Sequence, residues 1–264
     1  MSTPKSLDKK VSVQILIALL FIRIVVVNGL KFANLANSYE LIEIIELVEY
    51  VGIGLLIVIE RPFLKENNIS VIPIYALIFV NSILRIPVND SIDELVIKVF
   101  FWITSIALFY FLLKERMWEP ARESNAIGHL FIGILFGLIL SFVLKFFPGY
   151  LGGIRFNISY SSLVNFFTSV IVDSQHSAIF EELLFRGFLV GYLTKIGISN
   201  LKILFIQSFL FWIAHISIIS LGFGFFIALP IGSIVLGYLA LRYKSVLPSL
   251  LTHIIYNSSD YFIS

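Results

Sequence analysis

Long runs of apolar residues, separated by short polar segments, dominate the chain. A helix needs about 20 apolar residues to cross the hydrocarbon core of a bilayer, and runs of that length recur here. The pattern predicts an all-α fold, a polytopic transmembrane helical bundle of about eight or nine spans. Residues 160–194 form either one long, bent helix or two short ones, which leaves the span count open. The candidate ranges are 11–30, 41–59, 69–87, 95–113, 126–147, 160–178, 179–194, 201–220, 223–241 and 246–262.

The polar segments between these runs favour one orientation. Lysine and arginine concentrate on the side that holds the N-terminus, for example at Lys9, Arg61 and Arg242. By the positive-inside rule, this bias predicts a cytoplasmic N-terminus. The run from Val11 to Leu30 is not followed by a small-x-small cleavage site, so we expect a first transmembrane helix and not a cleaved signal peptide. The predicted location is the cell membrane, as a multi-pass integral protein.

Composition supports lipid as the natural solvent and narrows the choice of function. The chain is 58% hydrophobic and only 14% charged, whereas soluble domains are about 25% charged, and its mean hydropathy is +0.96. A net charge of +2 provides no basic field for nucleic acid, so the bilayer is the expected partner and nucleic acid is not. The chain has no cysteine, which excludes disulfides, a thiol nucleophile and thiolate metal sites.

Ionisable residues inside an apolar range point to a functional site, because each costs roughly 2.5–3.5 kcal/mol at a helix centre. The range 179–194 contains Glu181, Glu182 and Arg186 close together. Glu182 and Arg186 have the i,i+4 spacing with the acid first, which favours an ion pair on a helix. Glu181 is rotated by about 100° from its neighbour. We therefore expect Arg186 to neutralise Glu182 while Glu181 faces another helix.

Two further apolar ranges contribute imidazoles. Phe211 and His215 are four residues apart, as are His253 and Asn257. Three helices can thus bring Glu181, His215 and His253 together at one depth. A carboxylate and an imidazole in an apolar cavity can activate water, and burial makes the carboxylate a stronger base. A second imidazole and an amide can stabilise the oxyanion of a tetrahedral intermediate. The pattern therefore predicts hydrolysis without a serine or cysteine nucleophile.

Other functions remain open for the same residues. A carboxylate with two imidazoles is an acceptable catalytic zinc set, although the sequence has no H-E-x-x-H motif. A polar cluster inside a membrane can also bind a peptide or relay protons without catalysis. Taken singly, the Glu182–Arg186 pair can be a structural lock, and each histidine can be a hydrogen bonder between packed helices.

Together the motifs resemble a known family. E-E-x-x-x-R-G starts at Glu181, F-x-x-x-H runs from Phe211 to His215, and H-x-x-x-N runs from His253 to Asn257. This combination, within roughly residues 175–260, resembles the CAAX protease and bacteriocin-processing (CPBP) family, which includes Ras-converting CAAX endopeptidases and bacterial Abi proteins. The resemblance implies one membrane domain over 1–264, with variable N-terminal helices at 1–125 and a protease-like core at 126–264.

The resemblance also implies an activity and a role for each motif residue. The activity is that of an intramembrane glutamic-type endopeptidase, which acts on a membrane-associated peptide or protein and needs no metal or cofactor. A non-catalytic bacteriocin immunity or peptide-binding protein and a zinc-dependent membrane hydrolase remain the alternatives. The implied roles are water activation by Glu181 with His215, oxyanion binding by His253 and Asn257, organisation of the first motif by Glu182 and Arg186, and packing beside the site by Phe211.

Overall fold

The fold is known from a computed structural model, which describes residues 39–66, 126–153, 156–171, 178–215 and 222–262, with isolated positions between 11 and 18 and between 99 and 110. These segments are mainly helical, and no β-strand element forms within them. The predicted all-α class is confirmed for these described segments. The predicted ranges 11–30, 69–87 and 95–113 lie outside the described segments, so the number of spans stays a prediction.

The helices follow one another with short connections. Three of them contain π-helical stretches, labelled η1 to η3, and the last one ends in the 3-10 turn η4. In chain order the elements are α2 (Tyr39–Glu66), α5 (Ala126–Ser141), η1 (Phe142–Phe146), α6 (Phe147–Leu151), α7 (Tyr160–Ile171), α9 (Ala178–Glu181), η2 (Glu182–Leu189), α10 (Val190–Lys195), α11 (Asn200–Ala214), η3 (Gly224–Ala228), α12 (Leu229–Tyr243), α13 (Leu247–Ser258) and η4 (Ser259–Phe262).

Two of the described helices are long and apolar enough to cross a membrane. They are Ala126–Gly149 and Gly224–Tyr243, with mean hydropathies of 2.5 and 2.1. Both turn large apolar side chains outward: Phe131 in the first and Phe226 in the second are 68% and 59% exposed. Exposed apolar surface of this kind marks a contact with lipid or protein. The two helices coincide with the predicted ranges 126–147 and 223–241.

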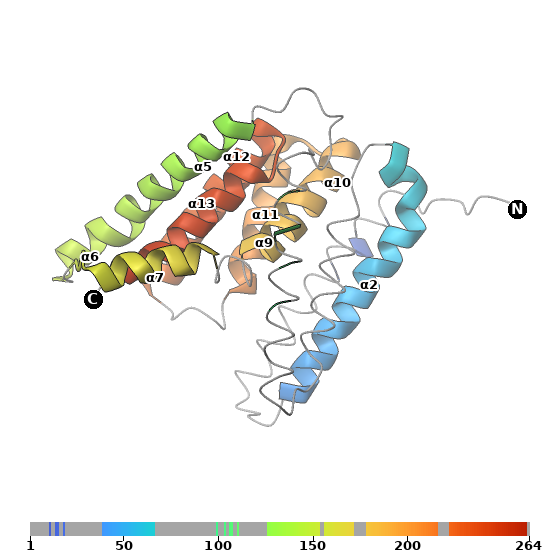
Figure 1. Cartoon of the computed structure of the whole chain (residues 1–264). Helices are drawn as coiled ribbons and strands as arrows, with labels where there is room; N and C mark the ends of the chain where they lie inside the picture. Colours follow the sequence, from blue (N-terminus) through green and yellow to red (C-terminus); the bar gives the residue numbers. More distant parts are fainter. Residues whose placement is uncertain are drawn as a thin grey trace, which may run out of the picture.

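Helices α5 and α13 run side by side (Figure 1), and two glycines of α5 allow their close approach. A Cβ atom on Gly133 would lie 2.6 Å from the Cβ of Leu251, and one on Gly137 would lie 2.6 Å from the Cβ of Ile255. Glycines four residues apart share one helix face, as in the small-xxx-small pattern of packed membrane helices. The Thr252 hydroxyl adds a hydrogen bond of 3.0 Å to the Gly133 carbonyl. This contact fixes α13, which carries the third motif.

The buried core surrounds η2 and α10. All eight residues of η2 are buried, and this segment contacts α11, α12 and α13. Helix α2 closes the core on another side, where Phe63 meets the Tyr192 ring edge-on at 5.6 Å between centroids. The charged residues of the first motif therefore lie among helices and not against lipid.

Candidate active site

The three motifs meet at one place in the bundle. Glu181 ends α9, His215 directly follows α11, and His253 lies in α13. His215 Nε2 is 3.5 Å from Glu181 Oε2, and His253 Nε2 is 3.9 Å from the same oxygen. Both distances exceed those of a direct hydrogen bond, which are about 2.7–3.2 Å. Within the described segments, this oxygen is buried and has no hydrogen-bond partner, so neither imidazole holds it.

The other ring nitrogen of each histidine is already committed. His215 Nδ1 lies 2.8 Å from the Phe211 carbonyl, and His253 Nδ1 lies 2.9 Å from Glu182 Oε1. A carbonyl and an ionised carboxylate only accept hydrogen bonds, so each Nδ1 donates. Both Nε2 atoms are thereby left facing Glu181. Partners of this kind fix the tautomer and orientation of an imidazole.

Glu182 lies behind His253 and forms the ion pair expected from the spacing. Its Oε1 accepts a hydrogen bond of 3.0 Å from Arg186 Nη1 as well as the one from His253. The side chains of Glu182 and Arg186 are both 0% exposed. Arg186 Nη2 also lies 3.4 Å from the Ser233 hydroxyl. The pair therefore connects the first motif to α12 and to the imidazole of the third motif.

The backbone of the first motif differs from the α-helix that the i,i+4 spacing predicted. From Glu182 to Leu189 the helix is π-helical, so its backbone hydrogen bonds reach from i to i+5. The fully buried Arg186 lies in this stretch. Such π-helical insertions occur frequently at functional sites.

The ring of Phe211 packs against the charged and imidazole groups together. Its centroid lies 4.0 Å from Arg186 Cζ and 4.4 Å from the centroid of His215. The His253 ring meets it edge-on at 5.9 Å. A guanidinium over an aromatic face is attracted by the ring quadrupole. Phe211 therefore holds Arg186 and both imidazoles in fixed relative positions.

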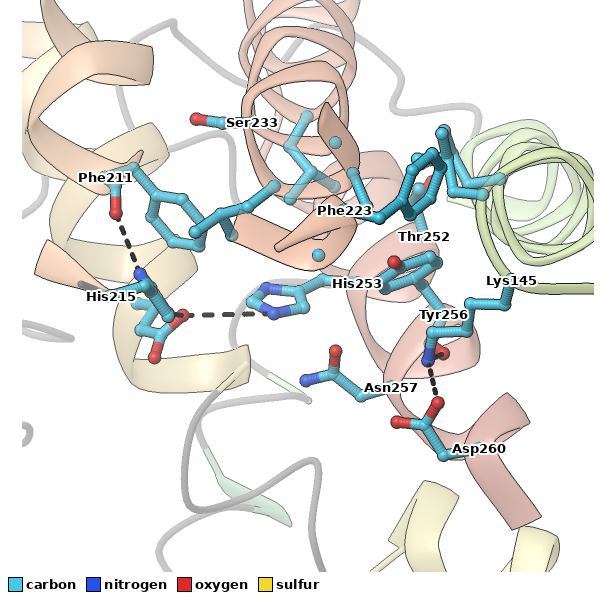
Figure 2. A pocket seen from close by; sticks show the side chains of 18 residues that line it. Lys145, Phe211, His215, Phe223, Ser233, Thr252, His253, Tyr256, Asn257 and Asp260 are labelled. Atoms are coloured by element: carbon cyan, nitrogen blue, oxygen red, sulfur yellow. Dashed lines mark hydrogen bonds and ion pairs between the residues drawn. The ribbon is translucent and has the colours of Figure 1, made fainter. Parts of the chain in front are cut away.

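A cavity of about 540 Å³ opens beside Glu181. Glu181, Phe211, His215, His253 and Asn257 all line it, whereas Glu182 and Arg186 do not. Figure 2 shows the Asn257 amide next to the His253 ring, one helical turn further along α13. Five of the seven residues selected from the sequence thus face the cavity, and the other two lie buried behind it.

The cavity wall also contains polar residues that the sequence patterns did not select. Lys145, Tyr256 and Asp260 form one end of it, and Ser233 lies in its wall near Arg186. A signal for Lys145 is present, because it is a cation inside the apolar range 126–147. Ser233 gives no such signal, since serine is common in membrane helices and its contact with Arg186 depends on the packing of α12.

A carboxylate and two imidazole nitrogens are also the donors that a catalytic zinc ion uses. In the segments that the structure describes, no group of three or more histidine, cysteine, aspartate or glutamate side chains is arranged to hold a metal ion. The zinc alternative is tested by chelation.

The described helices, two of them long and apolar enough to cross a membrane, bring a carboxylate and two imidazoles together beside a cavity, which is typical of membrane proteins with intramembrane polar sites. Residues 163–259 match the family described as type II CAAX prenyl endopeptidase Rce1-like. This segment, 97 of the 264 residues, therefore carries a domain of the CAAX protease family. The matched segment contains all three motifs. Searches of curated proteins and of solved structures gave no match.

Proposed function

We propose that this chain is an intramembrane glutamic-type endopeptidase that hydrolyses a peptide bond in a membrane-associated peptide or protein. The observation that carries the proposal is the convergence of His215 Nε2 and His253 Nε2 on Glu181 Oε2, at 3.5 and 3.9 Å, beside a cavity. The carboxylate oxygen has no hydrogen-bond donor among the described residues. It is therefore available to accept a proton from a water molecule in the cavity.

In the proposed first step, water in the cavity loses a proton to Glu181 while its oxygen attacks the carbonyl carbon of the scissile bond. His215, whose Nδ1 proton stays with the Phe211 carbonyl, accepts a hydrogen bond from the same water through Nε2 and orients it. Because the two groups come from α9 and the end of α11, they hold the water from two sides. Positioning of this kind removes much of the entropic barrier to attack.

In the second step, the negative charge that develops on the carbonyl oxygen requires hydrogen-bond donors. The Asn257 amide supplies one donor, and the proposed second donor is the Nε2 proton of a His253 ring that is protonated on both nitrogens; both side chains line the cavity. Glu182 keeps the Nδ1 proton of His253 and so orients the ring. The C–N bond then breaks as Glu181 returns the proton to the leaving amine. The products are a new carboxylate terminus and a new amine terminus, so the hydrolysis consumes one water molecule.

The location of the cavity supports a substrate that reaches it from the membrane. Its wall comes from η1, α11, α12 and α13, and two of the helices involved are long and apolar enough to span a bilayer. We propose a multi-pass topology with the N-terminus in the cytoplasm. The distribution of lysine and arginine between the apolar ranges favours this orientation.

The test is to replace Glu181 by glutamine, which keeps the shape of the side chain and removes the base. Purified full-length protein in detergent is assayed against a pool of N-acylated, internally quenched peptides. We expect the rate to fall by about 10²–10⁴, the usual contribution of a general base. Glu66→Gln is the matched control, because Glu66 is exposed at the end of α2, and it should keep the wild-type rate. Undiminished cleavage by a folded Glu181→Gln protein would reject the proposed base.

A further inference from the structure

One end of the cavity contains an ion pair that the proposed reaction does not use. Lys145 Nζ in η1 lies 2.6 Å from Asp260 Oδ1 in η4. The same ammonium donates to the Tyr256 carbonyl at 2.5 Å and lies 4.0 Å from the centroid of the Tyr256 ring. Figure 2 shows these three side chains together, on the opposite side of His253 from His215.

The two members of this ion pair differ in how firmly they are held. The Lys145 side chain is 11% exposed, whereas that of Asp260 is 69% exposed. The backbone carbonyl and the ring of Tyr256 position the cation from α13. The anion, in contrast, belongs to a short 3-10 turn and faces outward. The cavity thus contains a buried, positioned cation whose anionic partner can be exchanged at low cost, since a mostly exposed carboxylate is readily solvated.

The ammonium also has capacity for a further ligand. It has three N–H donors, and the Tyr256 carbonyl and Asp260 account for two of them. Within the described parts of the chain, Asp260 is the acidic residue that pairs with Lys145. Loss of Asp260 from this position would leave a largely buried cation beside the cavity, and an incoming carboxylate would restore its neutral surroundings.

The distance from the proposed reaction centre suits a peptide. His253, Asn257 and Asp260 lie on successive turns of α13 and η4. Seven residues of helix from His253 to Asp260 correspond to about 10 Å along the axis at 1.5 Å per residue. An extended peptide covers about 3.3 Å per residue. A carboxylate only a few residues from the cleaved bond would therefore reach Lys145.

We propose that Lys145 binds a carboxylate group of the peptide substrate, and that Asp260 occupies this position until the peptide displaces it. The inference rests on the proposed function and adds a specificity-determining residue to it. The carboxylate belongs either to the C-terminus of the peptide or to an acidic side chain near the cleaved bond, and the two sources are separated by the choice of peptides.

The experiment compares KM for three forms of one peptide that the pool shows to be cleaved. One form has a free C-terminal carboxylate, the second a C-terminal amide, and the third an amide with one aspartate after the cleaved bond. Lys145→Met is expected to raise KM about tenfold or more for the carboxylate-bearing forms, because they lose one charge-assisted hydrogen bond. Asp260→Asn is expected to lower KM for the same forms, because it removes the internal competitor.

The opposite signs of the two effects distinguish binding from support of the fold. If the ion pair only held η4 in place, both substitutions would impair cleavage of all three peptides alike, and that result would overturn the inference. Equal KM values for all three peptides with the wild-type protein would overturn it too. Lys202→Met is the matched control, since Lys202 is exposed on α11 and does not line the cavity; its KM values should equal those of the wild type.

Binding measurements separate this inference from the proposed reaction. Fluorescence anisotropy of the labelled peptides is recorded with the Glu181→Gln protein, which binds without turnover. A preference of about tenfold for carboxylate over amide, lost in the Lys145→Met/Glu181→Gln double variant, supports the carboxylate site even where no peptide is cleaved. Absence of that preference, in a protein whose wild-type form cleaves the peptides, overturns the carboxylate site and leaves the peptidase proposal standing.

Discussion

The close contact between α5 and α13 predicts that an alanine at Gly137 destabilises the protein. Replacing Gly137 by alanine normally stabilises a helix interior by about 0.5–1 kcal/mol, because glycine loses more backbone entropy on folding. Here the new Cβ would lie 2.6 Å from the Cβ of Ile255 and 3.1 Å from the Thr252 carbonyl oxygen. Carbon atoms in contact lie about 3.5–4.0 Å apart. The helices must therefore separate locally by about 1 Å.

This separation has two costs. Overpacking of a tight interface costs about 1–3 kcal/mol, and the hydrogen bond of 3.0 Å from Thr252 to the Gly133 carbonyl lengthens beyond hydrogen-bonding distance. After subtraction of the helix gain, we expect Gly137→Ala to lower the free energy of unfolding by about 1–3 kcal/mol. Catalytic rate should fall as well, because displacement of His253 by about 1 Å is enough to reduce a rate by up to about 10².

The assay is unfolding of the full-length protein in mixed micelles by increasing fractions of sodium dodecyl sulfate, followed by tryptophan fluorescence. Gly232→Ala is the matched control for stability, because a Cβ at Gly232 in α12 meets nothing within 4 Å. This control should be as stable as the wild type or slightly more stable. If Gly137→Ala proved as stable as Gly232→Ala, the close approach of α5 to α13 would be refuted.

Two more predictions concern the charged groups. Arg186→Met leaves the fully buried Glu182 without its cation and should lower the free energy of unfolding by about 3–5 kcal/mol in the same assay. The double variant Glu182→Gln/Arg186→Met should lose less than the sum of the losses of the two single variants. Strict additivity would contradict the pairing. Peptide cleavage should survive prolonged dialysis against 1,10-phenanthroline, because the proposed step uses Glu181 and His215 without a metal, whereas loss that added zinc restores would favour the zinc hydrolase.

The sequence predicted the parts of the fold that depend on local pattern. The apolar runs at 126–147, 223–241 and 246–262 correspond to helices, because their length and hydropathy are local properties. The i,i+4 spacing of Glu182 and Arg186 likewise predicted an ion pair, and it forms at 3.0 Å. The π-helical backbone of η2 was not predicted. This stretch packs against α11, α12 and α13, which are distant from it in sequence, so no local pattern indicates its backbone geometry.

In the candidate site, too, local sequence patterns predicted some features, whereas contacts between distant helices could not be predicted. The ionisable residues could be selected because charges are rare in apolar ranges, but their partners on other helices could not. His253 Nδ1 contacts Glu182 across 71 positions of sequence, and Lys145 contacts the Tyr256 carbonyl across 111. Contacts between residues so far apart in sequence depend on how the helices pack. The glycine pair at 133 and 137 indicates that another helix approaches closely, but it does not indicate which helix.

The two consecutive glutamates illustrate why burial and not residue type separates their proposed roles. Glu182 is 0% exposed, does not line the cavity and accepts hydrogen bonds from Arg186 and His253 at Oε1, so a proton on its carboxyl group would remove the charge that strengthens both contacts. Glu181 is 25% exposed, lines the cavity and directs an unpartnered oxygen between two imidazoles. Protonation of Glu181 costs no such contact. A general base must gain and lose a proton in each turnover, and we therefore propose Glu181, and not Glu182, for that role.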